Sequence, residues 1–323
     1  MVSPTIKCIG HAILVAVGMT AAACSQAADV TVRCGGGGED AFPSISMALA
    51  HLDARGPNTV TVYGACQENV SISFFNRLTL NANAGASISD ASGGANSVIA
   101  ITDSQTVVFS GFTINGAVVC KITSTCGFFG NTFQNSPGDG LLIASGSYAL
   151  LNGDRIVNNT LGRGMVVDGG SRVDATGITL TGNGVGVGVA DSGIRAQQGA
   201  VLLLTASTIA NNGSNGVRIT DHSTLHSTDN TVTGNVDNGV SVESGSEARF
   251  TRVGRGNVIS GNGNYGVLIA DLSLGNNETA GNNISGNHTT TNAGQPDVQC
   301  VGKSPAGIGM ALSAGTVSAT CGP

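Results

Sequence analysis

The sequence has no tryptophan and little charge. Of its 323 residues, 11% are charged and 4% are aromatic, whereas soluble domains average about 25% charged residues. This scarcity excludes a highly charged disordered chain, and it excludes a coiled coil, which needs heptads rich in charged and helix-forming residues. With 14 basic against 20 acidic residues, the chain also lacks the clustered positive charge of a nucleic-acid-binding protein. We therefore expect no nucleic-acid partner.

Apolar residues and glycine are what the chain has in quantity. Hydrophobic residues make up 41% of the sequence, which is near the globular norm, so a core can be buried. The 49 glycines amount to about twice the usual share of about 7%. They do not recur at every third position, which excludes a collagen triple helix.

The N-terminal segment, residues 1–28, has the layout of a secretory signal peptide. Lys7 precedes an apolar run over residues 12–17, and small residues follow up to Ala27 and Ala28. The run is short for a membrane span, which needs about 20 apolar residues. We therefore expect this segment to be removed and the mature chain 29–323 to be secreted or periplasmic, without a membrane span.

Cysteine parity argues against a lipid anchor at Cys24. Removing Cys8 and Cys24 leaves six cysteines, an even number that an exported chain can oxidise. The sequence does not fix their connectivity, but proximity along the chain favours the pairs Cys34–Cys66, Cys120–Cys126 and Cys300–Cys321. Free buried thiols are the alternative. A zinc site is disfavoured because the chain has no Cys-x2-Cys spacing.

A five-residue motif recurs through the second half of the chain. Each copy begins with glycine and has apolar residues at its second and fourth positions, which is the alternation of a strand with one buried face. The six copies, which follow one another at similar intervals, are Gly140–Ala144, Gly164–Asp168, Gly193–Gln197, Gly216–Thr220, Gly239–Glu243 and Gly266–Ala270. In the same phase, each repeat has an asparagine three residues after an apolar residue: Asn159, Asn183, Asn212, Asn235, Asn262 and Asn287.

The length of the repeat limits its structure. The shortest steps, such as the one from Gly216 to Gly239, are too short for a β–helix–β unit, which takes about 30 residues or more. They are long enough for three short strands and three turns. One such unit cannot enclose its own apolar side, so the units must stack. Stacking places equivalent residues about 4.8 Å apart, and the asparagines then form an internal ladder.

This pattern resembles the right-handed parallel β-helix proteins, the pectate-lyase-like superfold, over essentially the whole mature chain. It predicts an all-β, single-stranded right-handed parallel β-helix of about nine or ten turns. Apolar residues recur at helical spacing within residues 39–55, so we expect a short helix there to cap the N-terminal end. Residues 295–323, closed by Cys300–Cys321, are expected to cap the other end, and the protein is expected to be a monomer.

The outward positions of the repeated strand carry the candidate site. Positions three and five of each copy point outward, and their charged members lie in the middle of the stack: Asp168, Arg195, Arg218 and Glu243. We expect these residues to form one patch about 15 Å wide, enough for two or three sugar units of an anionic chain. The insertion Gly184–Ser192 could form a wall beside the patch. The alternative is a solvated ladder of ion pairs, worth about 0–1 kcal/mol.

His222 adjoins this patch, in the turn that follows the strand. Asp221 precedes it, and other repeats have glycine at the same point: Gly146, Gly170, Gly199 and Gly245. Glycine there indicates a positive φ or a close approach. Since histidine titrates near neutral pH, His222 is a candidate general acid or base, and a tolerated turn residue is the alternative.

The resemblance implies a class of activity rather than one activity. Many β-helix proteins act on acidic polysaccharides as lyases, hydrolases or epimerases. For a uronate-polymer lyase, it implies Arg195 or Arg218 as the base with help from His222, while substrate or Ca²⁺ would be held by Asp168, Asp221 and Glu243. The polygalacturonase and mannuronan-epimerase signatures are absent, so the fold does not decide the activity. A non-catalytic carbohydrate-binding, cell-surface or structural repeat protein is the alternative.

Overall fold

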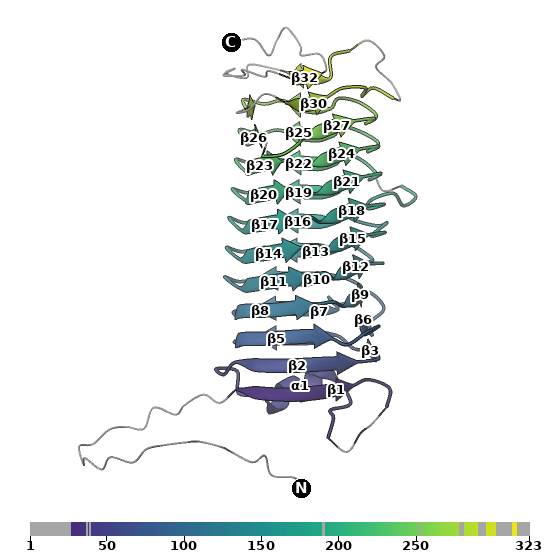
Figure 1. Cartoon of the computed structure of the whole chain (residues 1–323), viewed down its shortest axis with the longest axis vertical. Coiled ribbons are helices and arrows are strands. Elements are labelled where there is room, and N and C mark those ends of the chain that lie inside the picture. Colours follow the sequence, from purple (N-terminus) through teal and green to yellow (C-terminus); the bar gives the residue numbers. More distant parts are fainter. Residues whose placement is uncertain are drawn as a thin grey trace, which may run out of the picture.

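Three parallel sheets wind around one core. The computed structural model describes residues 27–36, 38, 40–188, 191–251, 253–277, 281–289, 295–301 and 312–314, and within them it has one helix and sheets of 11, 10 and 11 strands. Each coil of the chain supplies one strand to each sheet in turn, and the coils stack into a column (Figure 1). The chain is a right-handed parallel β-helix, as the repeat predicts. Ten complete coils of three strands lie within the described residues, in agreement with the nine or ten expected, and some are short, such as the coil from Val107 to its strand partner Cys126.

The strands of each sheet lie in chain order. Sheet 1 contains β1 (Ala28–Arg33), β2 (Asn58–Tyr63), β5 (Asn76–Ala82), β8 (Gln105–Ser110), β11 (Thr125–Phe129), β14 (Tyr148–Asn152), β17 (Arg172–Thr176), β20 (Val201–Thr205), β23 (Thr224–Thr228), β26 (Glu247–Thr251) and β29 (Leu274–Asn277). Sheet 2 contains β4 (Val70–Ser73), β7 (Ile99–Thr102), β10 (Val118–Lys121), β13 (Leu141–Ile143), β16 (Met165–Val167), β19 (Ile194–Ala196), β22 (Val217–Ile219), β25 (Val240–Val242), β28 (Val267–Ile269) and β31 (Val298–Cys300). Sheet 3 contains β3 (Ala65–Gln67), β6 (Ser87–Ser89), β9 (Thr113–Asn115), β12 (Thr132–Gln134), β15 (Arg155–Val157), β18 (Thr179–Thr181), β21 (Thr208–Ala210), β24 (Thr231–Thr233), β27 (Val258–Ser260), β30 (Asn282–Ile284) and β32 (Leu312–Ala314).

The core is built by alternation along these short strands. In β22, Val217 and Ile219 are fully buried while Arg218 between them points outward. Four phenylalanines fill the N-terminal half of the column, with ring centroids 5.4–6.1 Å apart between neighbours: Phe109, Phe112, Phe128 and Phe133. Burial of each large apolar side chain contributes roughly 1.5–3 kcal/mol, so the stack of coils carries the stability.

The helix α1 (Ile45–His51) lies at the N-terminal end of the column (Figure 1). Its first turn is held by the Glu68 carboxylate, which accepts hydrogen bonds from the backbone N–H groups of Ile45 at 2.7 Å and Ser46 at 3.0 Å. The helix is shorter than the expected cap segment 39–55, because Phe42 forms a β-bridge with Val32 of β1 before the helix begins.

Two of the three expected disulfides are present: Cys34–Cys66 and Cys120–Cys126. Cys300 is disulfide-bonded, and Cys321, the partner expected for it, lies outside the described residues. So do residues 1–26, which hold most of the expected signal peptide, and most of the expected C-terminal cap. No helix among the described residues is long and apolar enough to cross a membrane.

The predicted asparagine ladder runs inside the corner between sheets 3 and 2. In each asparagine the backbone N–H and the side-chain Nδ2 both donate to Oδ1 of the next, over distances of 2.9–3.2 Å, through Asn159, Asn183, Asn212, Asn235, Asn262 and Asn287. Asp297 ends the ladder by accepting both bonds from Asn287. The side chains thereby satisfy backbone groups that a buried turn would otherwise leave unpaired.

The other two corners have ladders that the sequence analysis did not identify. Between sheets 1 and 3 the column contains Asn131, Asp154, Ser207, Asn230, Asn257 and Asn282, interrupted at Ile178. Between sheets 2 and 1 it contains Ser104, Ser124, Ser147, Ser171, Ser223, Ser246 and Ser273, interrupted at Ala200. All three corners of the column are therefore held by side-chain oxygens that accept from backbone N–H groups one coil away.

Asn212 tests the asparagine ladder. Replacing it by alanine (Asn212→Ala) leaves the backbone N–H and the Nδ2 of Asn183 without their acceptor in a dry interior. We expect the free energy of unfolding to fall by about 3 kcal/mol, measured by urea denaturation. Asn152→Ala is the control, because that side chain is exposed and its loss should cost under about 0.5 kcal/mol. Equal losses in the two variants would contradict the role of the ladder.

Asp154 gives the fold a pH dependence. Burial raises the pKa of Asp154 to about 6, against about 3.9 for an unfolded chain. The folded state therefore holds the proton more tightly, and the stability that Asp154 contributes is complete below pH 4 and is lost as the pH rises toward 6. Between pH 4 and pH 7, we expect Asp154→Asn to gain about 3 kcal/mol relative to the unsubstituted protein, as measured by urea unfolding. Asp40→Asn, at an exposed position, should give no such difference, and parallel curves for Asp154→Asn would show that its burial has no such effect.

Candidate functional site

The register of sheet 2 brings the two predicted arginines together. Arg195 of β19 lies opposite Arg218 of β22, with Val166 on the coil before and Ser241 on the coil after. All four residues occupy the outward third position of the motif. The stack therefore places the arginines next to each other, as predicted, where like charges repel unless they are compensated. Both arginines are partly buried, and their neighbours Val166 and Ser241 are buried.

Arg218 has a counter-ion, and Arg195 has none in the described part of the chain. Arg218 Nη2 lies 2.7 Å from Glu243 Oε2, and Ser241 Oγ donates to the other oxygen of that carboxylate at 2.6 Å. Among the described residues, none forms a hydrogen bond or ion pair with the Arg195 side chain, whose Nε is buried. Of the predicted pair of arginines, Arg195 is thus the one left open to a ligand.

The surroundings of Arg195 disfavour its charge. Burial is the largest effect that lowers its pKa, followed by the positive charges of Arg163 and Arg218, while Asp221 and Asp191 act in the opposite direction. The net direction is downward, because desolvation and repulsion together outweigh the two carboxylates. An anion placed against Arg195 would relieve both effects.

Arg163 is a member of this cluster that the sequence analysis missed. Its Nε lies 3.0 Å from Asp191 Oδ1 and its Nη1 lies 3.4 Å from Asp139 Oδ2. Arg163 occupies the position just before the motif glycine Gly164. The residue type at that position changes from repeat to repeat, and one coil earlier it is Asp139, so the repeat does not single Arg163 out.

The predicted acidic residues surround the arginines without converging. Glu243 pairs with Arg218, and Asp221 lies in the turn after β22 with a φ of 55°, where its carboxylate accepts from Thr220 Oγ1 at 3.3 Å. Asp168 is half-buried and forms no ion pair among the described residues, and its Oδ1 is buried without a hydrogen bond. No hydrogen bond or ion pair joins its carboxylate to Arg195 in the described part of the chain.

His222 lies in a left-handed turn, but its ring is directed at the next coil. Its φ is 61°, close to the 70–74° of the glycines at the same point in other coils: Gly146, Gly170, Gly199 and Gly245. Thr123 and Leu272 also occupy this point at positive φ, so His222 is one of several tolerated exceptions. Its imidazole is exposed and lies against Gly245, with Cδ2 3.1 Å from where a Cβ of that residue would stand. No described residue forms a hydrogen bond with its ring.

The residues proposed as Ca²⁺ ligands are not placed to form a Ca²⁺ site. Within the described residues, one group of three potential ligand atoms converges within 4.8 Å, and it consists of Cys34, Cys66 and Glu68. Both sulfurs in that group are used by a disulfide. Asp168, Asp221 and Glu243 do not form such a group, whereas Ca²⁺ takes six to eight oxygen ligands.

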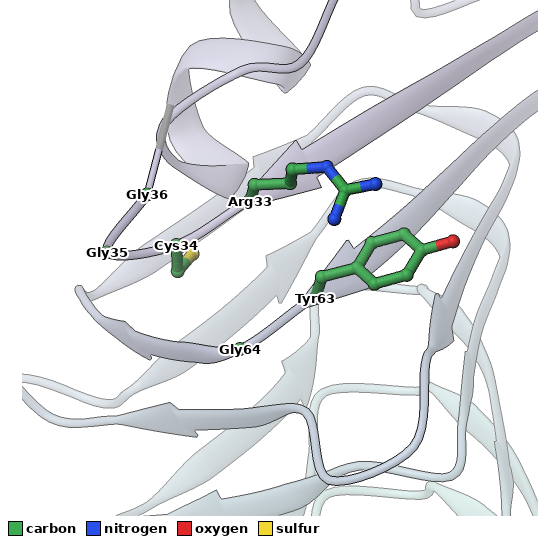
Figure 2. A pocket seen from close by; sticks show the side chains of 6 residues that line it. All are labelled: Arg33, Cys34, Gly35, Gly36, Tyr63 and Gly64. Carbon is green, nitrogen blue, oxygen red and sulfur yellow. The ribbon is translucent and has the colours of Figure 1, made fainter. Parts of the chain in front are cut away.

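Three hollows of the surface lie away from the arginines of sheet 2. Figure 2 shows one of about 400 Å³ at the ends of β1 and β2, lined by Arg33, Cys34, Gly35, Gly36, Tyr63 and Gly64. The guanidinium carbon of Arg33 lies 4.4 Å from the centre of the Tyr63 ring, so a cation already covers the aromatic face. The other two lie beside Asp229 and beside α1. None of these three hollows includes Arg195.

Comparisons with known proteins agree with the fold. A family model described as "Right handed beta helix region" matches residues 97–253. The crystal structure of pectate lyase Pel9A superposes with a TM-score of 0.56 at 14% identity, over 82% of each chain. The periplasmic alginate epimerase AlgG gives a TM-score of 0.46 at 14% identity, over 88% of this chain and 67% of the other. No curated protein matches the sequence. At 14% identity, the superposition on pectate lyase Pel9A shows the fold alone. The chemistry has to be argued from the residues of the site.

The carboxylate placement predicts that Ca²⁺ does not stabilise the protein. A cation that binds only the folded state raises the unfolding midpoint, and the rise grows with the logarithm of its concentration once that exceeds Kd. We expect the midpoint of thermal unfolding to be the same in Ca²⁺ and in chelator, with Mg²⁺ as the ionic-strength control. A midpoint that rises with Ca²⁺, and stops rising in Asp168→Asn, would contradict this expectation.

Proposed function

We propose that this chain is a secreted protein that binds an acidic polysaccharide across the arginines of sheet 2 and cleaves it by β-elimination. The observation that carries the proposal is Arg195, a half-buried guanidinium without a counter-ion among the described residues, which stands beside Arg218 on sheet 2. A carboxylate-bearing sugar chain would bring negative charge to this pair of arginines, with its carboxylate on Arg218. The disulfides Cys34–Cys66 and Cys120–Cys126 support an oxidising compartment.

Arg195 is suited to the base of this reaction. The base removes the proton from the carbon beside the uronate carboxylate, the freed electron pair forms a carbon–carbon double bond, and the glycosidic C–O bond breaks. The leaving oxygen then takes a proton from water. Arginine is ordinarily too basic to give up its proton, but burial and the charges of Arg163 and Arg218 lower the pKa of Arg195.

Arg218 is suited to hold the substrate carboxylate. It lies next to Arg195, it is half-exposed, and Glu243 fixes the direction of its guanidinium. Neutralising the substrate carboxylate makes the neighbouring proton more acidic. A pectate lyase is among the solved structures with this fold, which supports an acidic polysaccharide as the substrate class.

Binding without cleavage is the second candidate. It is favoured by the position of the three hollows described above, since none of them encloses Arg195 and so none would hold a substrate away from water at that residue. It is also favoured by the orientation of His222, whose ring lies against Gly245.

A panel of pectate, alginate and glycosaminoglycans separates the two candidates. A lyase produces unsaturated sugar ends, which absorb ultraviolet light, and a binder only retards one polymer in a gel. We expect Arg195→Ala to abolish the absorbance, lowering the rate at least about a hundredfold, and to weaken retardation. Arg155→Ala is the matched control, since Arg155 is exposed on sheet 3, and it should change neither readout.

The absorbance and the gel retardation together decide between the lyase and the binding function. Retardation that depends on Arg195 without any absorbance establishes the binding function and rejects the lyase. If no polymer gives either response, the proposed function is wrong as a whole.

A further inference from the structure

The longest coil of the motif region carries an insertion immediately before Arg195. The step from Gly164 to Gly193 is longer than any other step between successive motif glycines. The insertion Gly184–Ser192 lies between β18 and β19, and its described residues are 184–188, 191 and 192.

The insertion is fastened to the turn of the preceding coil. The backbone N–H of Gly184 donates to the Asn159 carbonyl at 3.0 Å, and that of Gly186 donates to the Thr160 carbonyl at 2.8 Å. Asp191, near the end of the insertion, thereby comes next to Arg163. Its carboxylate lies 3.0 Å from Arg163 Nε, and both side chains are largely covered, with exposed fractions of 30% and 25%.

Arg163 is itself fixed from the other side. Its backbone N–H donates to Asp139 Oδ1 at 2.9 Å, and its Nη1 lies 3.4 Å from the other oxygen of that carboxylate. Arg163 thus stands between a carboxylate of the preceding coil and a carboxylate of the insertion. Asp139 holds the guanidinium in place, and the guanidinium holds Asp191.

Asp191 also acts on Arg195, although it does not bond to it. It is one of the two carboxylates whose charge reaches the Arg195 guanidinium, the other being Asp221. Asp191 therefore lies within electrostatic reach of two guanidiniums and pairs with one of them, while the other remains without a partner among the described residues.

We propose that Arg163 is a positioning residue that keeps Asp191 away from Arg195, so that Arg195 stays open to an anionic ligand. This inference rests on the proposed function, in which Arg195 contacts the acidic polymer. Without Arg163, the carboxylate of Asp191 has one partly buried, uncompensated guanidinium within reach, and an ion pair between them would compete with the ligand. In this proposal, the insertion carries a carboxylate, Asp191, that could pair with Arg195, and the ion pair with Arg163 prevents this.

Three variants test the proposal through polymer affinity. We expect Arg163→Gln to weaken the binding of a polymer retarded by the unsubstituted protein about tenfold. Asp191→Asn alone should bind at least as tightly as the unsubstituted protein, and the double variant Arg163→Gln/Asp191→Asn should recover the affinity. A merely structural anchor gives a different pattern, with equal losses in both single variants and no recovery in the double variant. That pattern would overturn the proposal.

A second measurement does not depend on any polymer. Phenylglyoxal attacks the neutral form of an accessible guanidine, and peptide mapping reports its rate at each arginine. Loss of the Arg163 charge alone raises the pKa of Arg195 and slows its reaction, so the test compares two backgrounds. Asp191→Asn should speed the labelling of Arg195 several-fold more in Arg163→Gln than in the otherwise unsubstituted protein, because only in Arg163→Gln does Asp191 pair with Arg195. Equal factors in the two backgrounds refute the proposal.

The two measurements separate the failure of this inference from the failure of the proposed function. If no polymer binds but the labelling rates of Arg195 differ between the variants as expected, Arg163 keeps Asp191 away from Arg195 and the ligand class is wrong. If polymers bind but the expected difference in labelling rates is absent, the inference fails and the proposed function stands. Arg155→Gln is the control for both, and the midpoint of thermal unfolding confirms that each variant is folded.

Discussion

The structure depends on coils that stack in register, each strand hydrogen-bonded to the strand one coil away. With a spacing of about 4.8 Å, every residue lies directly on its equivalent in the next repeat, so one choice of residue is multiplied along the column. Inside, this turns a single asparagine per coil into the ladder from Asn159 to Asn287. Outside, it places Arg195 on Arg218, a pair of like charges that the fold does not separate. The candidate site follows from the same constraint that builds the core.

Charge compensation then distinguishes residues that the register makes equivalent. Arg218 is neutralised by Glu243 one coil further on, and Arg163 lies between Asp139 and Asp191. The acids that surround these arginines are at least as numerous as the arginines, so the face as a whole is not a basic patch. What makes it a candidate anion site is local, since among these described arginines Arg195 alone lacks a direct partner and is partly desolvated. Net charge would have missed this, because it depends on which carboxylate reaches which guanidinium.

The features that could be predicted from the sequence are those that recur at a fixed position of the repeat. The motif glycine fixes the register, so the neighbours of Arg195 followed from counting residues, and an asparagine three residues after an apolar residue is conspicuous enough to reveal a ladder. The serine ladder from Ser104 to Ser273 was not predictable in this way, since serine is common in turns. Arg163 was missed because its position holds Asp139, Ser192 and Asn215 in other coils. The ring direction of His222 and the pairing of Glu243 depend on side-chain rotamers, which no spacing determines.

In a stacked column of this kind, we expect functional residues where the length of a coil varies. The strands themselves can hardly vary in length, because each must pair with the strands of the adjacent coils. The insertion at Gly184–Ser192 shows how a variation is admitted: Asn183 still donates to Asn212, and the Gly193 N–H still donates to the Asn215 carbonyl. The extra residues therefore leave the ladder and the register of β19 intact. Among those that are described is Asp191, whose carboxylate pairs with Arg163 and whose charge reaches Arg195. The insertion therefore changes the electrostatics of the face while the hydrogen bonds of the stack on either side of it are kept.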